Sequence, residues 1–117
     1  MRPGEVEFIG DAADAFEELN KTVEDEKKRG IDNSDNQKLL NSISRAVNLL
    51  KEDVFFGIQI KKNLIPKQYD VDNLWKVNLT GFWRLLYTVQ GGEAEIICFV
   101  LEICDHDKYD KIFGYKS

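Results

Sequence analysis

The chain has 117 residues, a net charge of −5, 43% hydrophobic residues and two prolines. This composition predicts a single globular domain over residues 1–117 and excludes disordered and collagen-like proteins. No run of about 18 apolar residues occurs, so no membrane-spanning helix is predicted, and the surplus acid lies wholly in residues 1–54. A nucleic-acid contact would therefore need a local basic cluster in residues 55–117, whose charges balance.

The first half of the chain is predicted to form one strand and two helices. Polar and apolar residues alternate over residues 5–9, which predicts a short strand that Gly10 ends. Apolar residues then recur at helical spacing over residues 11–28 and again over residues 34–51. Because only a short loop separates the two helices, we expect them to pack as an antiparallel hairpin.

The second half is predicted to be mainly strands. Three runs have strand-like patterns and are separated by turn residues: 74–79, 82–89 and 94–104. From residue 96 onward the third run is apolar on both faces except at Glu102, which predicts the central strand. Residues 54–66 are mixed, with at most a short extended piece at residues 59–60. The tail, residues 105–117, is polar and aromatic, and its first part is expected to form a short helix.

This order of elements predicts an α+β fold. Its features are a short first strand, a two-helix hairpin packed on one face of a small, mainly antiparallel sheet, and a short C-terminal tail. No glycine-rich nucleotide motif and no nucleophile elbow occurs, so the sequence predicts no cofactor.

The two cysteines indicate a reducing compartment. Cys98 and Cys104 lie in one apolar run, where an unbroken strand would point both to the same side about 20 Å apart, too far for a disulfide. No further His or Cys lies at zinc-ligand spacing, so we expect reduced, buried thiols. The first eight residues include acids where a secretory signal is apolar. These observations predict a cytoplasmic protein.

Strand alternation brings a possible phosphodiester site together. Lys76 and Arg84 occupy adjacent strands, each on the side opposite the bulky apolar residues. If the helices cover the apolar side, both cations emerge on the other, open face. The last strand delivers His106 and one or both of Tyr109 and Tyr115 to that face. Arg neutralises phosphate, Lys adds charge, and His or Tyr can move protons.

The same residues also have an ordinary structural interpretation. Lys76 and Arg84 would then be the solvated face of a half-exposed sheet, and the aromatic residues of the tail would only pack against that sheet. His106 lies between two aspartates, which would favour a surface imidazolium, and Lys61 and Lys62 would lie on a solvated loop.

Two stretches of the second half resemble the RelE/ParE superfamily of toxins from type II toxin–antitoxin systems. Residues 74–79, Leu-Trp-Lys-Val-Asn-Leu, are followed at 81–89 by Gly-Phe-Trp-Arg-Leu-Leu-Tyr-Thr-Val. They match that family's aromatic-Lys strand, glycine turn and aromatic-Arg-hydrophobic-hydrophobic-Tyr strand. The apolar run 96–103 then closes on Asp-His-Asp-Lys-Tyr-Asp, where family members often carry a His or Arg followed by a Tyr. Residues 57–117 are most similar to a RelE-like branch common in archaea.

The resemblance implies a toxin that cleaves messenger RNA in the ribosomal A site, an mRNA interferase. The 2′-hydroxyl attacks the adjacent phosphate, so this endoribonuclease needs no metal and no cofactor. Its expected partners are the ribosome, messenger RNA and a cognate antitoxin that holds it inactive. Arg84 would stabilise the transition-state phosphate, Lys76 would help to hold it, and His106 would be the general acid or base, with Tyr109 nearby.

Further RNA contacts are expected from Lys61, Lys62 and Asn78, the last of which stands where the best-known members carry a second Lys. The alternative is a non-catalytic RelE-fold protein that binds a protein partner or RNA without cleavage. Active ribosome-directed toxins are usually basic, whereas this chain has a charge of −5. Other members of the superfamily act on DNA gyrase and lack nuclease chemistry. A gyrase-directed toxin has no use for a pair like Arg84 and His106, so this pair favours the nuclease.

Overall fold

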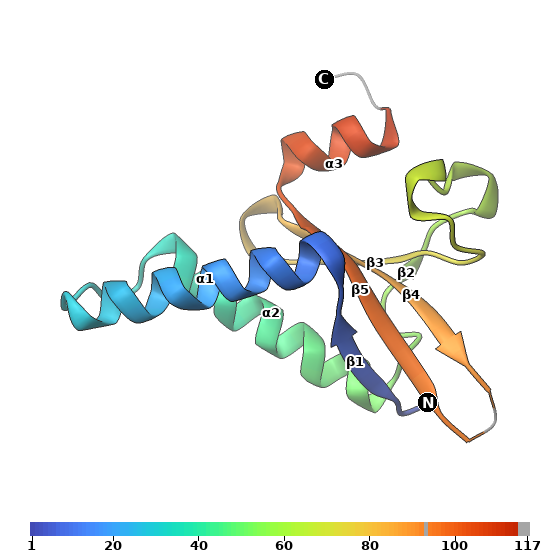
Figure 1. Ribbon diagram of the computed structural model, residues 1–117, viewed down its shortest axis with the longest axis horizontal. Coiled ribbons are helices and arrows are strands. Elements are labelled where there is room, and N and C mark those ends of the chain that lie inside the picture. Colours follow the sequence, from blue (N-terminus) through green and yellow to red (C-terminus); the bar gives the residue numbers. More distant parts are fainter. Residues whose placement is uncertain (93, 115–117) are drawn as a thin grey trace.

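The computed structural model describes residues 1–92 and 94–114, which form an α+β fold. Along the chain the elements are β1 (Glu5–Phe8), α1 (Gly10–Lys28), α2 (Asp35–Glu52), β2 (Ile58–Gln59), β3 (Trp75–Asn78), β4 (Arg84–Gly91), β5 (Ile96–Cys104) and α3 (His106–Phe113). Within these residues the strands form one mixed sheet in the order β1-β5-β4-β3-β2, and only β1 and β5 run parallel (Figure 1). The α+β class and the mainly antiparallel sheet are thus confirmed, although β4 rather than β5 lies in the middle.

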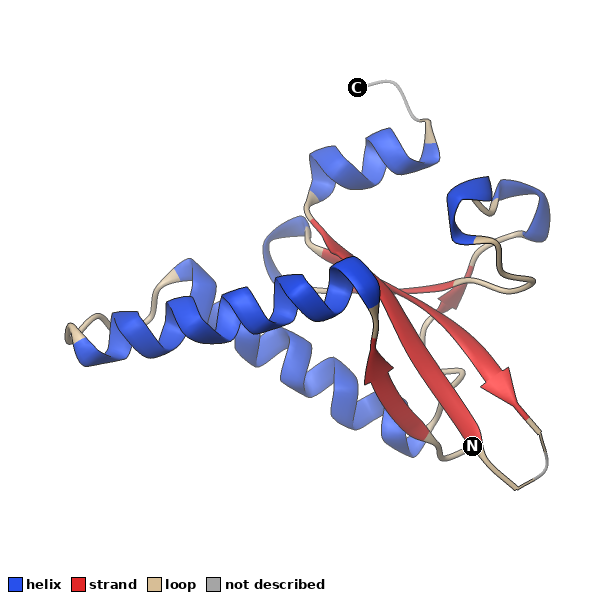
Figure 2. Cartoon of the chain, in the orientation of Figure 1, coloured by secondary structure: helices blue, strands red, loops and turns tan. Residues whose placement is uncertain are grey.

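The helices α1 and α2 lie side by side and cover one face of the sheet (Figure 2). Ser34 is the N-cap residue of α2, and its Oγ accepts a hydrogen bond of 3.1 Å from the Gln37 N–H. The apolar sides of both helices and of the sheet form a buried cluster, which we call the helix-side core. It contains Ala12, Leu39, Ile43, Ala46, Leu50, Val54, Val77, Leu79, Leu85, Tyr87, Cys98, Val100 and Ile103.

A second apolar cluster lies on the opposite face and shows that the expectation of an open sheet surface is wrong. Its buried members are Leu74, Leu86, Cys104 and Tyr109. α3 packs on this face through Tyr109, Ile112 and Phe113, and the segment 60–71 adds further apolar side chains. The sequence pattern missed this cover because residues 54–66 mix charged and apolar residues without a period.

A bulge in β5 determines which of its side chains face α3. Glu102 is the partner of Leu86 in β4, whereas the next residue of β4 pairs with Val100. Leu101 is therefore an extra residue in the ladder, and the alternation of inward and outward side chains shifts by one beyond it. As a result Glu102 lies on the α3 side of the sheet.

The bulge also separates the two thiols. Cys98, before it, lies in the helix-side core, whereas Cys104, after it, lies in the second cluster. The expectation that both point to the same side is therefore wrong, because it assumed an unbroken strand. Both cysteines are free and buried, as expected, and burial raises the pKa of each thiol to about 12.

We expect both thiols to resist modification in the folded protein. At about pH 8, a pKa of about 12 leaves a thiolate fraction on the order of 10⁻⁴, and burial blocks access to the sulfur. An aromatic disulfide reagent should therefore titrate both thiols rapidly only after denaturant is added. The variants Cys98→Ala and Cys104→Ala assign each reaction, and a thiol that reacts rapidly in native buffer would contradict its burial.

Candidate functional site

Lys76 on β3 and Arg84 on β4 lie on the face of the sheet that α3 covers, as strand alternation predicts. The Tyr109 ring from α3 contacts both, since the Lys76 Nζ and the Arg84 Cζ are each 5.4 Å from its centroid. The Lys76 Nζ also donates a hydrogen bond of 3.4 Å to the Tyr109 Oη. We call these three residues the cationic cluster.

Among the described residues, no ion pair neutralises the positive charge of this cluster. Neither Lys76 nor Arg84 forms one within the part of the chain that the structure describes. The Arg84 Nη1 donates a hydrogen bond of 3.2 Å to the Trp83 carbonyl, while its buried Nε has no hydrogen-bond partner among the described residues. Both cations are only partly exposed, so water screens them less than on an open surface. The cluster therefore retains charge and donors for an anion such as phosphate.

Tyr109 is the least exposed member of the cationic cluster, at 6%. Burial raises the pKa of its hydroxyl, and the Arg84 charge opposes this shift only in part. The phenol is therefore protonated at neutral pH and can donate a proton or a hydrogen bond. Of the two tyrosines considered for this position, Tyr115 lies outside the described residues.

His106 is the first residue of α3, one turn before Tyr109. Its side chain is 58% exposed, and its Nε2 lies 3.2 Å from the Asp110 Oδ2. The imidazole ring centroid is 6.4 Å from that of Phe82, on the turn before β4. An accessible imidazole that a carboxylate orients has the geometry of a general acid or base.

An ion pair that the sequence pattern did not single out holds α3 against the sheet. The Lys108 Nζ lies 2.5 Å from the Glu102 Oε1, and the Glu102 side chain is almost completely buried. The hydrogen bond to Glu102 raises the pKa of Lys108. The available signal was that Glu102 is the single charged residue in an apolar run of the sequence. Such a residue is rarely buried without a partner.

The three residues expected to contact RNA lie in two different places. Asn78 is exposed and is the register partner of Arg84, so it adjoins the cationic cluster. Lys61 and Lys62 are exposed on the segment between β2 and β3, and no interaction joins either to the cluster among the described residues. The structure thus brings together Lys76, Arg84, Tyr109 and Asn78, with His106 one helical turn away.

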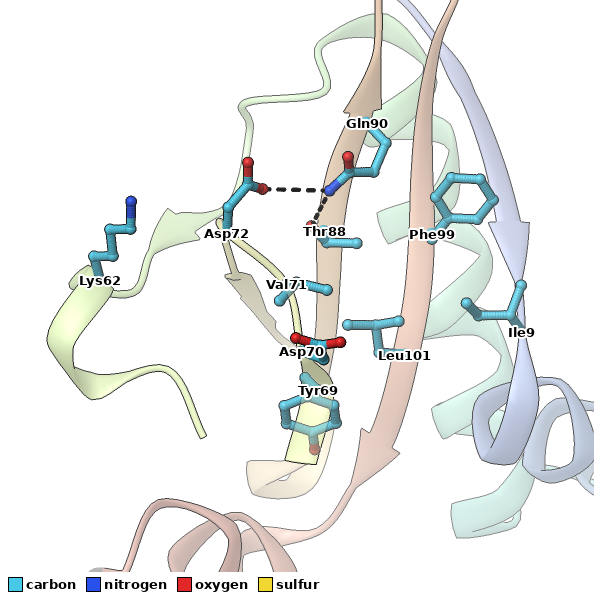
Figure 3. Close-up of a pocket in the computed structure, with 10 residues that line it drawn as sticks. All are labelled: Ile9, Lys62, Tyr69, Asp70, Val71, Asp72, Thr88, Gln90, Phe99 and Leu101. Atoms are coloured by element: carbon cyan, nitrogen blue, oxygen red, sulfur yellow. Dashed lines mark hydrogen bonds between the residues drawn. The ribbon is translucent and has the colours of Figure 1, made fainter. Parts of the chain in front are cut away.

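An open groove of about 760 Å³ lies on the same face of the sheet, between strands β4 and β5 and the segment that precedes β3 (Figure 3). Its lining residues are Ile9, Lys62, Tyr69, Asp70, Val71, Asp72, Thr88, Gln90, Phe99 and Leu101. The Gln90 Nε2 donates a hydrogen bond of 3.1 Å to the Thr88 Oγ1. Because Asp70 and Asp72 outnumber Lys62, this groove does not favour an anion.

No family model, no curated protein and no solved structure matches the chain. Among the described residues, no three His, Cys, Asp or Glu side chains are grouped so that they could hold a metal ion. No helix in residues 1–92 or 94–114 has the length and apolar character needed to cross a membrane.

We expect Lys108→Met to loosen α3. The substitution leaves the buried Glu102 carboxylate without its cation, which should cost about 1–2 kcal/mol. The loss is smaller than for a fully buried pair because the Lys108 side chain is 54% exposed. Chemical denaturation measures the total loss, and hydrogen exchange at the Tyr109 amide reports local opening.

Lys111→Met is the matched control, because Lys111 is an exposed lysine of the same helix that forms no ion pair with a described residue. Equal stabilities of the two variants would show that the Glu102–Lys108 pair does not anchor α3.

Proposed function

We propose that this chain is a RelE-like toxin of a type II toxin–antitoxin system that cleaves messenger RNA on the ribosome without a metal ion. The observation that carries the proposal is the cationic cluster. Lys76 and Arg84 extend from neighbouring strands to one protonated phenol, and neither cation forms an ion pair with a described residue. Two such cations suit the charge that develops on a phosphodiester in its transition state. The resemblance of residues 74–89 and 96–110 to RelE-like sequences supports the same assignment.

Each group of the site has a role in the proposed reaction. Arg84 and Lys76 bind the non-bridging oxygens of the phosphate. His106 accepts the proton of the 2′-hydroxyl as its oxygen bonds to phosphorus, and the bond from phosphorus to the 5′-oxygen breaks. Tyr109 donates a proton to that leaving oxygen, and its phenolate is stabilised by the two cations. The products are a 2′,3′-cyclic phosphate and a 5′-hydroxyl, and the nucleophile is the RNA's own hydroxyl.

The acidic net charge is compatible with this proposal because of where the acid lies. α1 carries seven acidic and three basic side chains, and it packs on the sheet face opposite the cationic cluster. An RNA strand at the cluster would therefore approach the molecule from the side that α1 does not cover. The same proposal places the protein in the cytoplasm, with a cognate antitoxin as its protein partner.

One observation favours the alternative, a non-catalytic RelE-fold protein that binds a partner without cleavage. Tyr109 is 6% exposed and already contacts both cations, so α3 partly shields the phosphate-binding groups. A protein that only binds another protein through this face would need no access to them.

Cleavage of messenger RNA on programmed ribosomes distinguishes the two functions. We expect codon-phased cleavage by the wild-type chain, reduced about 10²-fold or more in Arg84→Ala and Tyr109→Phe, and about 10²-fold in His106→Ala. Tyr109→Phe retains the ring that packs under the cations and removes only the hydroxyl.

Lys21→Ala is the control, because Lys21 pairs with Glu17 on the exposed side of α1. It should cleave like the wild type. A folded wild-type chain, free of antitoxin, that leaves messenger RNA intact would refute the nuclease and favour the partner-binding alternative.

A further inference from the structure

We infer that the chain binds a second phosphate of the same RNA strand in a hollow at the edge of the sheet, between α2 and the turn that joins β3 to β4. The hollow has a volume of about 470 Å³, and its lining residues are Lys38, Ser42, Arg45, Asn78, Leu79 and Thr80. The inference rests on the proposed function, because it names where the RNA substrate continues beyond the cationic cluster. We call this hollow the edge site.

The wall of the edge site that α2 provides follows from helical spacing. Lys38, Ser42 and Arg45 are separated by four and three residues, so all three lie on one side of α2. The Ser42 Oγ accepts a hydrogen bond of 3.0 Å from the Thr80 N–H, which joins α2 to the turn before β4. This bond fixes the two walls relative to each other.

The edge site is positively charged although the protein is acidic. Lys38 and Arg45 are exposed and form no ion pair with any residue that the structure describes. None of the described residues that line the hollow is acidic. α2 as a whole has three basic and two acidic side chains, in contrast to the acidic excess of α1. Two unpaired cations beside hydroxyl and amide groups suit a phosphate and its sugar.

Asn78 connects the edge site to the cationic cluster. It lines the hollow, and it is also the register partner of Arg84 in the β3–β4 ladder. Cross-strand partners have Cα atoms about 5 Å apart, so the two sites adjoin each other at this residue. A strand whose scissile phosphate lies on Arg84 would therefore pass Asn78 and place a neighbouring phosphate near Lys38 and Arg45. The Asn78 amide can contact the sugar or base between them.

Salt-dependent binding of a short, labelled single-stranded RNA tests the edge site. The full chain is compared with a Lys38→Gln/Arg45→Gln double variant by fluorescence anisotropy at a series of salt concentrations. We expect about tenfold weaker binding and a slope of log affinity against log salt that is lower in magnitude by roughly 0.7, which corresponds to one lost phosphate contact. Both side chains are exposed, so the variant should fold, and its thermal unfolding is recorded alongside.

Two further variants separate this inference from the proposed function. Lys21→Gln/Lys28→Gln on α1 removes the same charge from cations that pair with Glu17 and Glu24, and it should bind RNA like the wild type. Arg84→Ala tests the cationic cluster.

Wild-type affinity and slope in the Lys38/Arg45 variant, or an equal loss in the α1 control, would overturn the edge site. If the edge site were overturned in this way but Arg84→Ala still weakened RNA binding, the cationic cluster would remain supported. A loss confined to the Lys38/Arg45 variant would support the edge site and count against the cationic cluster. A wild-type chain that does not bind RNA would overturn both.

Discussion

The extra residue that β5 carries at Leu101 turns Glu102 toward α3. A buried carboxylate needs a cation, and Lys108 of α3 supplies it. One residue further along the helix, Tyr109 then meets the two cations of the neighbouring strands. A single-residue irregularity in one strand thus sets the docking of α3, and that docking assembles the cationic cluster.

The two faces of the sheet differ in what covers them and in charge. α1, with most of the surplus acid, and α2 bury the helix-side core. Within the described part of the chain, the other face is covered by two short elements, α3 and the segment 60–71. It carries Lys76 and Arg84, which form no ion pair with a described residue. α2 lies at the boundary, because Lys38 and Arg45 share a hollow with Asn78 at the edge of the sheet. The net charge of the whole chain therefore says little about the surface that would contact RNA.

The parts of the fold with a clear period could be predicted from the sequence. Alternation placed Lys76 and Arg84 on the side opposite the helix-side core, and helical spacing located α1 and α2 to within a residue or two. The bulge could not be predicted, because a run that is apolar on both faces has no alternation to interrupt. The cover that the segment 60–71 provides was missed for a related reason, since its apolar residues follow no period. The contact of Tyr109 with both cations depends on these two features and had to come from the structure.

The contact with Tyr109 has a physical consequence for phosphate binding at this site. Each cation–π contact is worth about 0.5–2 kcal/mol, rising with desolvation, whereas a phosphate can accept several hydrogen bonds from the two cations, each worth about 1.5–3 kcal/mol. A phosphate would therefore compete favourably with the ring for Lys76 and Arg84. Before a phosphate binds, the Tyr109 ring holds the partly buried side chains of Lys76 and Arg84 in place. This lowers the entropic cost of ordering the two side chains when an anion binds. The residue that shields the cations can thus also prepare them to bind phosphate.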